Sequence, residues 1–382
     1  MMKYKATDTG KLNIENGRFS AAARILLIVL FFAMICLPYP LKALLGDDVA
    51  DANLEKRALA KMPVFSWETI EDYPGQLEAY VNDHLPFRDA LIRANSRINY
   101  YGLHTSANRD VIIGKDGWLF YNRVSAGDPI ANYKGMDLFT EEELHSIGGK
   151  LEAFRESLLD AGKEFVLLIP PNKERIYSEY MPDRYGEPAR QSRVMQLTDY
   201  LRTNTNVRVC YPEEALLEAK NAIPGRDLYY KADTHWNFLG AYVGTRELFK
   251  ELNLTLPPVD EVTCTDTDPT ISDLADLLNM REDLNTVPDF TIGGYNDHGL
   301  HQDVSEDTLF TYHTKDGDPR SLFLIGDSFR VSMSAIAASG FSATKVIHYE
   351  TYTPGDALSS DADVIVWEIV ERNLGDLREL AF

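Results

Sequence analysis

The chain has 382 residues, of which 45% are hydrophobic and 25% charged, a composition typical of one large or two ordinary globular domains with full cores. Lys and Arg number 38 against 59 Asp and Glu, so the formal net charge is −21. A field of this sign repels phosphate backbones and argues against a nucleic-acid partner, and an anionic polysaccharide would need a local basic groove to offset it.

An apolar segment near the N-terminus predicts a membrane anchor. Residues 25–41 read ILLIVLFFAMICLPYPL and carry no charge. The length of this run is slightly under the ~20 residues that span a bilayer comfortably. Basic residues dominate before this segment and acidic residues follow it, so the positive-inside rule exports the body of the chain. We expect a cytoplasmic tail at 1–24 and a transmembrane signal anchor at 25–45. A cleaved signal peptide and a buried core helix are the alternatives.

The exported body is predicted to begin with helices. Apolar residues recur at near-helical spacing through residues 50–105, and Pro63, Pro74 and Pro86 punctuate the pattern. We expect residues 46–104 to form a helical extension that packs on a main domain of residues 105–382.

From about residue 111, predicted strands and helices alternate. The segment 111–121 predicts two short strands around a glycine turn, and Thr140 with Glu143 forms a capping-box pattern that opens a helix over 140–161. The apolar run 164–171 predicts a strand buried on both faces. Further helices are predicted at 189–203, 236–252, 271–279 and 329–339, further strands at 207–211, 321–327, 345–350 and 363–370, and a loop-rich stretch at 255–320. This order predicts an α/β fold with a mostly parallel sheet flanked by helices, which binds ligands beyond the carboxyl ends of its strands.

A predicted strand-to-helix turn at 322–330, LFLIGDSFR, carries the first candidate for chemistry. Ser328 follows the strand directly, so its hydroxyl is expected at the carboxyl edge of the sheet. The N-terminus of the following helix offers free backbone N–H groups, which can stabilise an oxyanion formed when a serine attacks an ester carbonyl. The alternative is that Ser328 or Asp327 simply caps the helix.

A second turn, within YYKADTHWNFLGAY at 229–242, carries Asp233 and His235. A serine hydroxyl is a weak nucleophile that needs a neighbouring base, and the pKa of imidazole suits it to that role. A carboxylate on the other ring nitrogen fixes the tautomer and stabilises the imidazolium. The alternative is that Asp233 or Thr234 caps the next helix and leaves His235 exposed. The two turns together predict a triad of Ser328, His235 and Asp233.

The GDSF and DTHWN…GAY motifs together resemble the SGNH-hydrolase-like O-acetyltransferases of exopolysaccharide synthesis, the alginate O-acetyltransferase (AlgJ/AlgX-type) family. The segments VIIGKDGWLFY, IPPNKERIYSEYMP and WEIVERNL also fit this family, so the resemblance covers roughly residues 75–382. It implies that Ser328 is the nucleophile, His235 the general base and Asp233 its orienting partner. It also implies an SGNH-hydrolase-like domain held in the periplasm by a single-pass anchor in the bacterial inner membrane.

The resemblance implies an O-acetyltransferase that passes acetyl through Ser328 to hydroxyls of an extracytoplasmic, alginate-like exopolysaccharide. It implies a membrane-bound O-acyltransferase as the source of acetyl and other exopolysaccharide synthesis proteins as partners. No nucleotide or acetyl-CoA fingerprint is evident, so no cofactor is expected. An SGNH-type acetylesterase and a non-catalytic, anchored component of a secretion complex are the alternatives. The chain ends soon after the last predicted strand, so no C-terminal carbohydrate-binding module is expected.

Four further polar residues lie near the predicted carboxyl edge of the sheet. Asn172 could supply a second oxyanion donor, and Lys173 or Tyr177 could contact substrate, the alternative being a proline-rich turn with a solvated lysine. Arg330, in the first turn after Ser328, could contact an acidic sugar or form a surface ion pair.

The remaining chemistry-bearing groups are cysteines and a histidine cluster. Cys210 and Cys264 lie in the exported body, where they could form a disulfide or remain separate buried thiols. Histidine and aspartate gather in the long loop without any recognised metal-ligand spacing, at Asp297, His298, His301 and Asp303. We therefore expect no metal site.

Overall fold

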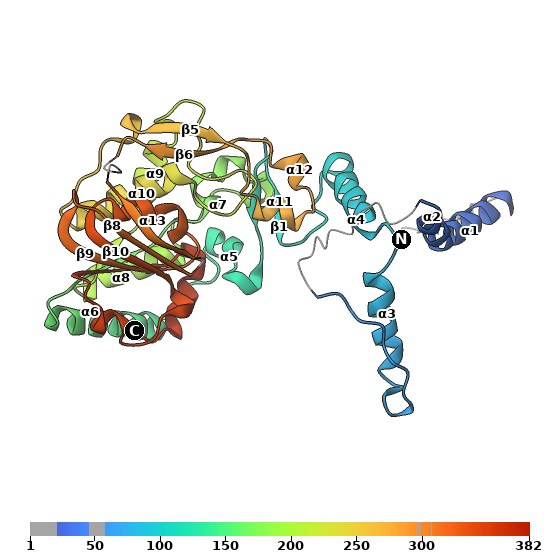
Figure 1. The fold of residues 1–382 in the computed structure, drawn as a ribbon, viewed down its shortest axis with the longest axis horizontal. Coiled ribbons are helices and arrows are strands. Elements are labelled where there is room, and N and C mark those ends of the chain that lie inside the picture. Colours follow the sequence, from blue (N-terminus) through green and yellow to red (C-terminus); the bar gives the residue numbers. More distant parts are fainter. Residues whose placement is uncertain (1–20, 46–57, 296, 298, 307) are drawn as a thin grey trace, which may run out of the picture. The chain divides into compact units, whose positions relative to one another are not determined.

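The computed structural model describes residues 21–45, 58–295, 297, 299–306 and 308–382 (Figure 1). The chain divides into two compact units, Met1–Ile92 and Arg93–Phe382. Most of the predicted cytoplasmic tail and the first part of the predicted helical extension lie outside the described residues.

The smaller unit contains three described α-helices, which are α1 (Ala21–Cys36), α2 (Pro38–Leu45) and α3 (Tyr73–Asp83). A further helix, α4 (Arg88–Arg97), crosses the boundary between the units. Proline stands in the first turn of both α2 and α3, where its missing N–H costs no helical hydrogen bond. The predicted signal anchor coincides with α1 and α2, and none of the described helices has both the length and the apolarity to cross a membrane.

The larger unit is built around a seven-stranded sheet in the order β4-β3-β11-β9-β10-β8-β7. Its parallel strands are β3 (Glu164–Leu168), β4 (Arg208–Cys210), β9 (Asp318–Gly326), β10 (Phe341–His348) and β11 (Val364–Glu368). Two antiparallel strands, β7 (His301–Glu306) and β8 (Leu309–His313), extend this sheet beside β10. The sheet is therefore mixed rather than uniformly parallel, and the strands at the antiparallel end come from the stretch predicted to be loop-rich. Most residues of β7 are exposed, so it lacks the apolar alternation by which a strand is recognised in a sequence.

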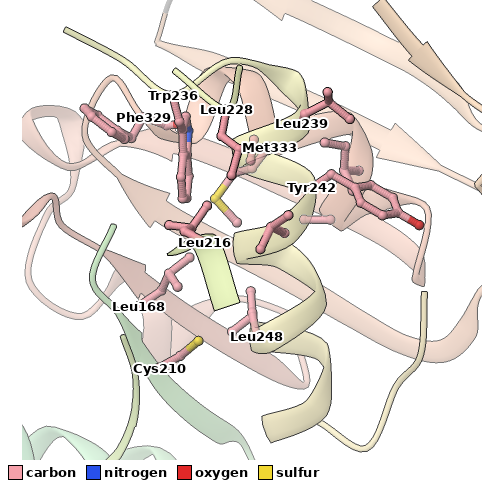
Figure 2. Packing of buried hydrophobic residues seen from close by; sticks show 14 of the residues in the cluster. Leu168, Cys210, Leu216, Leu228, Trp236, Leu239, Tyr242, Leu248, Phe329 and Met333 are labelled. Carbon is pink, nitrogen blue, oxygen red and sulfur yellow. The ribbon is translucent and has the colours of Figure 1, made fainter. Parts of the chain in front are cut away.

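Helices cover both faces of the sheet. The side chains of β3 alternate between two cores, with Phe165 and Leu167 in one and Val166 and Leu168 in the other. The first core is covered by α6 (Glu141–Asp160) and α8 (Arg193–Asn204), and the second by α9 (Glu213–Ala219), α10 (Phe238–Glu251) and α13 (Arg330–Ala338) (Figure 1). Figure 2 shows the second core, where residues of α9, α10 and α13 pack with Leu168 and Cys210. The predicted capping box at Thr140 is confirmed at the start of α6.

Shorter elements surround this three-layer body. Two hairpins lie outside the main sheet, formed by β1 (Val111–Ile113) with β2 (Leu119–Tyr121) and by β5 (Thr263–Thr267) with β6 (Asp289–Gly293). The remaining helices are α5 (Pro129–Lys134), α7 (Lys173–Ile176), α11 (Asp273–Leu277), α12 (Arg281–Leu284) and α14 (Asp356–Ser359). A wider π-helical turn follows α4 at Ile98–Leu103, and a tighter 3-10 helix at Glu371–Arg378 follows β11.

The structure also places the two cysteines and most of the predicted histidine cluster. Cys210 and Cys264 are separate free thiols, the first buried and the second half-buried. Burial raises the pKa of the Cys210 thiol, which makes it a poor nucleophile. In the predicted His/Asp cluster, His298 lies outside the described residues, and the Asp303 carboxylate is 2.8 Å from Nδ1 of His313.

Candidate active site

The turn before α10 carries two of the predicted triad residues. Asn237 caps this helix, because its side chain accepts hydrogen bonds from the backbone N–H groups of Leu239 and Gly240 at 2.9 and 3.2 Å. The alternative in which Asp233 or Thr234 caps α10 is therefore wrong. The Asp233 carboxylate is free of the helix and accepts a hydrogen bond from the backbone of His235 at 2.9 Å, which closes the turn.

Trp236 fixes the position of this turn on the core. Its indole is fully buried and rests on Gly244 of α10, where an added Cβ would lie 2.7 Å from the ring. Any larger residue at position 244 would push the indole away. Glycine is therefore required here because the indole lies so close to the helix backbone, and not because of the backbone conformation. The tryptophan that follows His235 in the motif is thus a core residue that seats the turn.

The second turn joins β9 to α13 and presents Ser328 at the carboxyl edge of the sheet, where it is exposed. Asp327 is buried and holds this turn through both carboxylate oxygens. One oxygen accepts from the backbone of Phe329 at 2.9 Å, and the other from the backbone of Val370 at 2.9 Å and the side chain of Asn373 at 3.1 Å. Neither Ser328 nor Asp327 is the N-cap of α13, which is Phe329, so the capping alternative is not what the structure shows.

A buried hydrogen bond connects the two turns. The indole Nε1 of Trp236 donates to the backbone carbonyl of Phe329 at 2.9 Å, and the side chains of these two residues lie side by side (Figure 2). The phenyl ring of Phe329 lies 4.9 Å from the imidazole of His235. Each partner in this bond is the chain neighbour of a predicted triad residue. In the resulting arrangement, His235 Nε2 lies 2.7 Å from Ser328 Oγ.

The other side of the imidazole faces Asp233. Nδ1 of His235 lies 2.7 Å from the Asp233 carboxylate, which is 3% exposed. With Nδ1–H donating to this carboxylate, Nε2 is free to accept the Ser328 hydroxyl proton. The structure therefore brings together the three side chains that the sequence predicts, in the order carboxylate, imidazole, hydroxyl.

The electrostatics of the pair favour a charged imidazole. Burial lowers the pKa of His235, but the hydrogen bond and negative charge of Asp233 outweigh burial and leave the pKa raised above its ordinary value. Burial likewise acts to raise the pKa of Asp233, and the contacts with His235 overcome it and hold that pKa well below the usual range. Asp233 therefore remains ionised, and His235 becomes a neutral base only as the pH rises above its own raised pKa.

Asp273, at the start of α11, is a site residue that the sequence analysis missed. Its carboxylate accepts hydrogen bonds from the backbone and hydroxyl of Thr234 at 2.8 and 2.6 Å, and its backbone N–H donates to Asp233 at 2.7 Å. Burial, reinforced by the charge of Asp233, raises the pKa of Asp273 to about 6. No local pattern marks this residue, because its partners lie about forty positions earlier in the chain.

Ligand atoms of Asp233, His235 and Asp273 lie within 4.8 Å of one another, close enough to suggest a metal site. The 2.7 Å separation between the imidazole and the Asp233 carboxylate is a hydrogen bond. The Asp273 carboxylate is engaged by Thr234. The geometry therefore matches a hydrogen-bond network that orients an imidazole.

Asn172 follows the end of β3, directly before α7, and is buried. Its amide oxygen accepts the backbone N–H of Arg372 at 3.2 Å, and its own backbone donates to Glu371 at 3.0 Å. The amide NH2 group is thereby turned away from Arg372 and keeps its donors for another acceptor. The guanidinium of Arg372 lies over the ring of Phe329, 5.1 Å from the ring centre.

The side chains of the other three predicted substrate contacts, Lys173, Tyr177 and Arg330, are buried. Lys173 is 1% exposed and donates to backbone carbonyls. Tyr177 stacks on Trp118 in the core, and its hydroxyl accepts the backbone N–H of Leu228 at 2.8 Å. Arg330 is also 1% exposed and donates to the backbone carbonyl of Asp327 at 2.8 Å, which strengthens the turn beside Ser328 from beneath.

Comparison with known sequences identifies the family. Residues 111–343 match the family described as "SGNH hydrolase-like domain, acetyltransferase AlgX", more than half of the chain and both turns of the site. The chain belongs to this family. Among curated AlgJ/AlgX-type relatives, the Pseudomonas putida protein named "Probable alginate O-acetylase AlgJ" is 24% identical over 148 residues, which is 39% of this chain and 35% of that protein. The chain spans well under half the length of the curated relatives it matches.

Solved structures share the fold of this chain. PatB1 of Bacillus cereus superposes with a TM-score of 0.51 at 15% sequence identity, covering 70% of this chain and 98% of that one. A DHHW family protein of Eubacterium siraeum gives a TM-score of 0.51 at 13% identity, covering 71% of this chain and 98% of that one. At these identities the likeness establishes the SGNH hydrolase-like α/β fold.

Proposed function

We propose that this protein is a polysaccharide O-acetyltransferase that works through an acetyl-serine intermediate on Ser328. The observation that carries the proposal is the 2.7 Å contact between Ser328 Oγ and Nε2 of His235 at an exposed edge of the sheet. An imidazole oriented by Asp233 and facing a hydroxyl is the arrangement that activates a serine nucleophile. Membership of the AlgJ/AlgX-type family supports acetyl as the transferred group.

The proposed chemistry has two balanced steps. As Ser328 Oγ attacks the acetyl carbonyl of the donor, His235 takes the hydroxyl proton and delivers it to the oxygen that leaves. In the second step, a sugar hydroxyl attacks the acetyl-serine carbonyl, His235 takes the sugar's proton, and Ser328 leaves with that proton. Asp233 stays ionised throughout and stabilises the imidazolium formed in each step.

Both steps pass through an oxyanion that needs hydrogen-bond donors. We assign this role to the amide NH2 group of Asn172 and the backbone N–H of Ser328. The Asn172 amide is held by its contacts with the segment after β11, so its donors need no reorganisation when charge develops. Preorganised donors of this kind contribute about 10²–10³ each to turnover in serine enzymes.

A membrane-proximal setting completes the proposal. The basic flank before residue 25 and the acidic flank after residue 45 support an inner-membrane anchor with the catalytic unit in the periplasm. In that compartment, we propose that a membrane-bound O-acyltransferase supplies the acetyl group and that other exopolysaccharide synthesis proteins deliver the polymer.

Trapping the intermediate tests the function directly. The full chain is incubated with a chromogenic acetyl ester and an alginate-like oligosaccharide, quenched, digested and examined by mass spectrometry. We expect an acetyl adduct on the peptide containing Ser328 and acetyl groups on the oligosaccharide. Turnover with an unmodified Ser328 peptide would contradict the mechanism, and release of acetate without any transfer to sugar would instead support an acetylesterase.

The position and charge of Arg372 favour an acidic polymer, such as a polyuronate, as the acceptor of the acetyl group. Its guanidinium lies over Phe329, beside His235, and within the described part of the chain no carboxylate pairs with it. An unpaired guanidinium is a ready partner for a carboxylate, and here it stands in a protein whose net charge of −21 otherwise repels anions. We propose that it supplies the local positive charge that an acidic sugar needs.

Arg372→Met is therefore expected to separate acidic from neutral substrates. Loss of a charge-assisted hydrogen bond should lower kcat/KM for acetyl transfer to an oligouronate by about 10- to 100-fold, with turnover of a neutral acetyl ester within about threefold of normal. Parallel kinetics on both substrates measure the difference. Arg202→Met, an exposed position on α8, serves as the control and should change neither rate. Equal losses on both substrates would show that Arg372 merely supports the fold.

A further inference from the structure

Lys173 is a buried cation beneath the proposed site. It begins α7 and is 1% exposed, yet its ammonium meets no carboxylate at hydrogen-bond distance among the described residues. Its Nζ donates instead to three backbone carbonyls, those of Tyr230 at 3.1 Å, Lys231 at 3.3 Å and Asp233 at 2.5 Å. Three N–H donors therefore meet three acceptors, all from the turn that carries Asp233.

The surroundings of this ammonium explain why it is tolerated. The rings of Trp118 and Phe120 lie 5.7 and 5.3 Å from Nζ and present their negative faces to the cation. The neighbouring carboxylate of Glu174 is occupied by the backbone N–H of Tyr121 at 2.9 Å. Burying a charge without an ion-pair partner is costly, so its presence here calls for a role beyond filling space.

We infer that Lys173 is a positioning residue for acyl transfer, whose ammonium holds the turn at 230–233 so that Asp233 and His235 face Ser328. The inference rests on the proposed function. The link is short, because the carbonyl of Asp233 is bound by Lys173 while the side chain of the same residue orients His235. A shift of this turn would carry the imidazole away from the 2.7 Å contact with Ser328 Oγ.

The protonation of Lys173 gives this arrangement a pH limit. Burial lowers the pKa of Lys173 to about 8, opposed by the charges of Glu174, Asp273 and Asp233 and reinforced by that of Arg372. A neutral amine has two N–H donors, so deprotonation removes one of the three hydrogen bonds by which Nζ holds this turn. Activity should therefore fall as the pH rises through about 8, while His235 sets the acidic limb.

Folding stability changes with pH in the opposite direction to activity. An unfolded lysine keeps its proton up to its ordinary pKa of about 10.4, so above pH 8 the unfolded chain binds more protons at this position than the folded chain. The contribution of Lys173 to folding stability therefore rises with pH between these two values. Loss of activity near pH 8 should accordingly occur in a protein that remains folded.

Kinetics against pH test the inference with the chromogenic acetyl ester and the full chain. We expect Lys173→Met to lower kcat by about 10- to 100-fold with KM within about threefold, because a misplaced base slows chemistry rather than binding. Lys173→Arg should keep part of kcat and lose the alkaline limb near pH 8, since a guanidinium stays charged there. Circular dichroism at each pH establishes that the protein is folded.

A matched control is available at Lys163, whose Nζ also donates to two backbone carbonyls, those of Ser360 and Ala362 at 2.6 and 2.7 Å, away from the site. Lys163→Met should leave both kcat and the alkaline limb unchanged. If Lys173→Met fails to fold, the native profile and Lys173→Arg still decide the matter. A kcat for Lys173→Met within about twofold of normal, or an alkaline limb that stays near pH 8 in Lys173→Arg, overturns the inference.

The inference and the proposed function can fail separately. Turnover that survives Ser328→Ala would overturn the proposed acyl-enzyme itself. Turnover lost in Ser328→Ala but unaffected by Lys173→Met would overturn only the positioning role of the lysine.

Discussion

Ser328→Ala is expected to lower acetyl transfer by at least about four orders of magnitude, because removing the nucleophile of a triad leaves only binding and oxyanion stabilisation. The hydroxyl is exposed and its contact is with His235, so its loss should leave the fold intact. Initial rates of acetyl transfer to an oligouronate, measured at equal concentrations of folded protein, give the comparison.

The control for this variant is Ser332→Ala, which removes a serine hydroxyl from α13, the helix that follows Ser328. It should retain normal transfer, and both variants should unfold within about 0.5 kcal/mol of the native protein. Transfer by Ser328→Ala at more than about a hundredth of the native rate would mean that another group carries the acetyl.

Asp327→Ala is expected to cause the largest loss of stability, about 3 kcal/mol or more. The buried carboxylate accepts three hydrogen bonds, from the backbones of Phe329 and Val370 and from Asn373. Each buried donor left without an acceptor costs about 1–3 kcal/mol. Denaturant unfolding monitored by tryptophan fluorescence measures the change in the free energy of unfolding.

Asp361 provides the comparison for this substitution, because it is exposed in the segment before β11. Asp361→Ala should alter the free energy of unfolding by less than about 0.5 kcal/mol. A loss below about 1 kcal/mol for Asp327→Ala would show that water or a rearranged turn satisfies the three donors. The role assigned to this carboxylate would then be wrong.

The main sheet was predictable where its strands are buried. The apolar run of β3 and the runs that become β9 and β11 lie between helices, as strands covered on both faces do. The hairpin of β7 and β8 was not predictable in this way, because the edge strand β7 is mostly exposed and needs no apolar alternation. Its addition turns a parallel sheet into a mixed one.

The site was predictable where chemistry and local structure coincide in one motif. The turn containing Ser328 and the turn containing Asp233 and His235 each precede a helix, and in an α/β fold such turns meet at one edge of the sheet. Asp273 could not be found in the same way, because its contact with Thr234 joins segments about forty residues apart.

Buried cations were the other failure of sequence reasoning. Lysine and arginine are almost never fully buried, so Lys173 and Arg330 were interpreted as surface groups able to reach a substrate. Each instead binds backbone carbonyls of one of the two turns. Only the tertiary structure reveals that a cation reaches these carbonyls from within the core.

The hydrogen bond from Trp236 to the carbonyl of Phe329 has a consequence for how this protein can evolve. Base and nucleophile are each one residue away from a bond inside the core, so their separation is set by packing and not by the loops that rim the site. Insertions or exchanges in those loops can thus reshape what the site accepts while the reacting groups keep their spacing. Diversification among distant relatives, such as the AlgJ homologue at 24% identity, can proceed without rebuilding the chemistry each time.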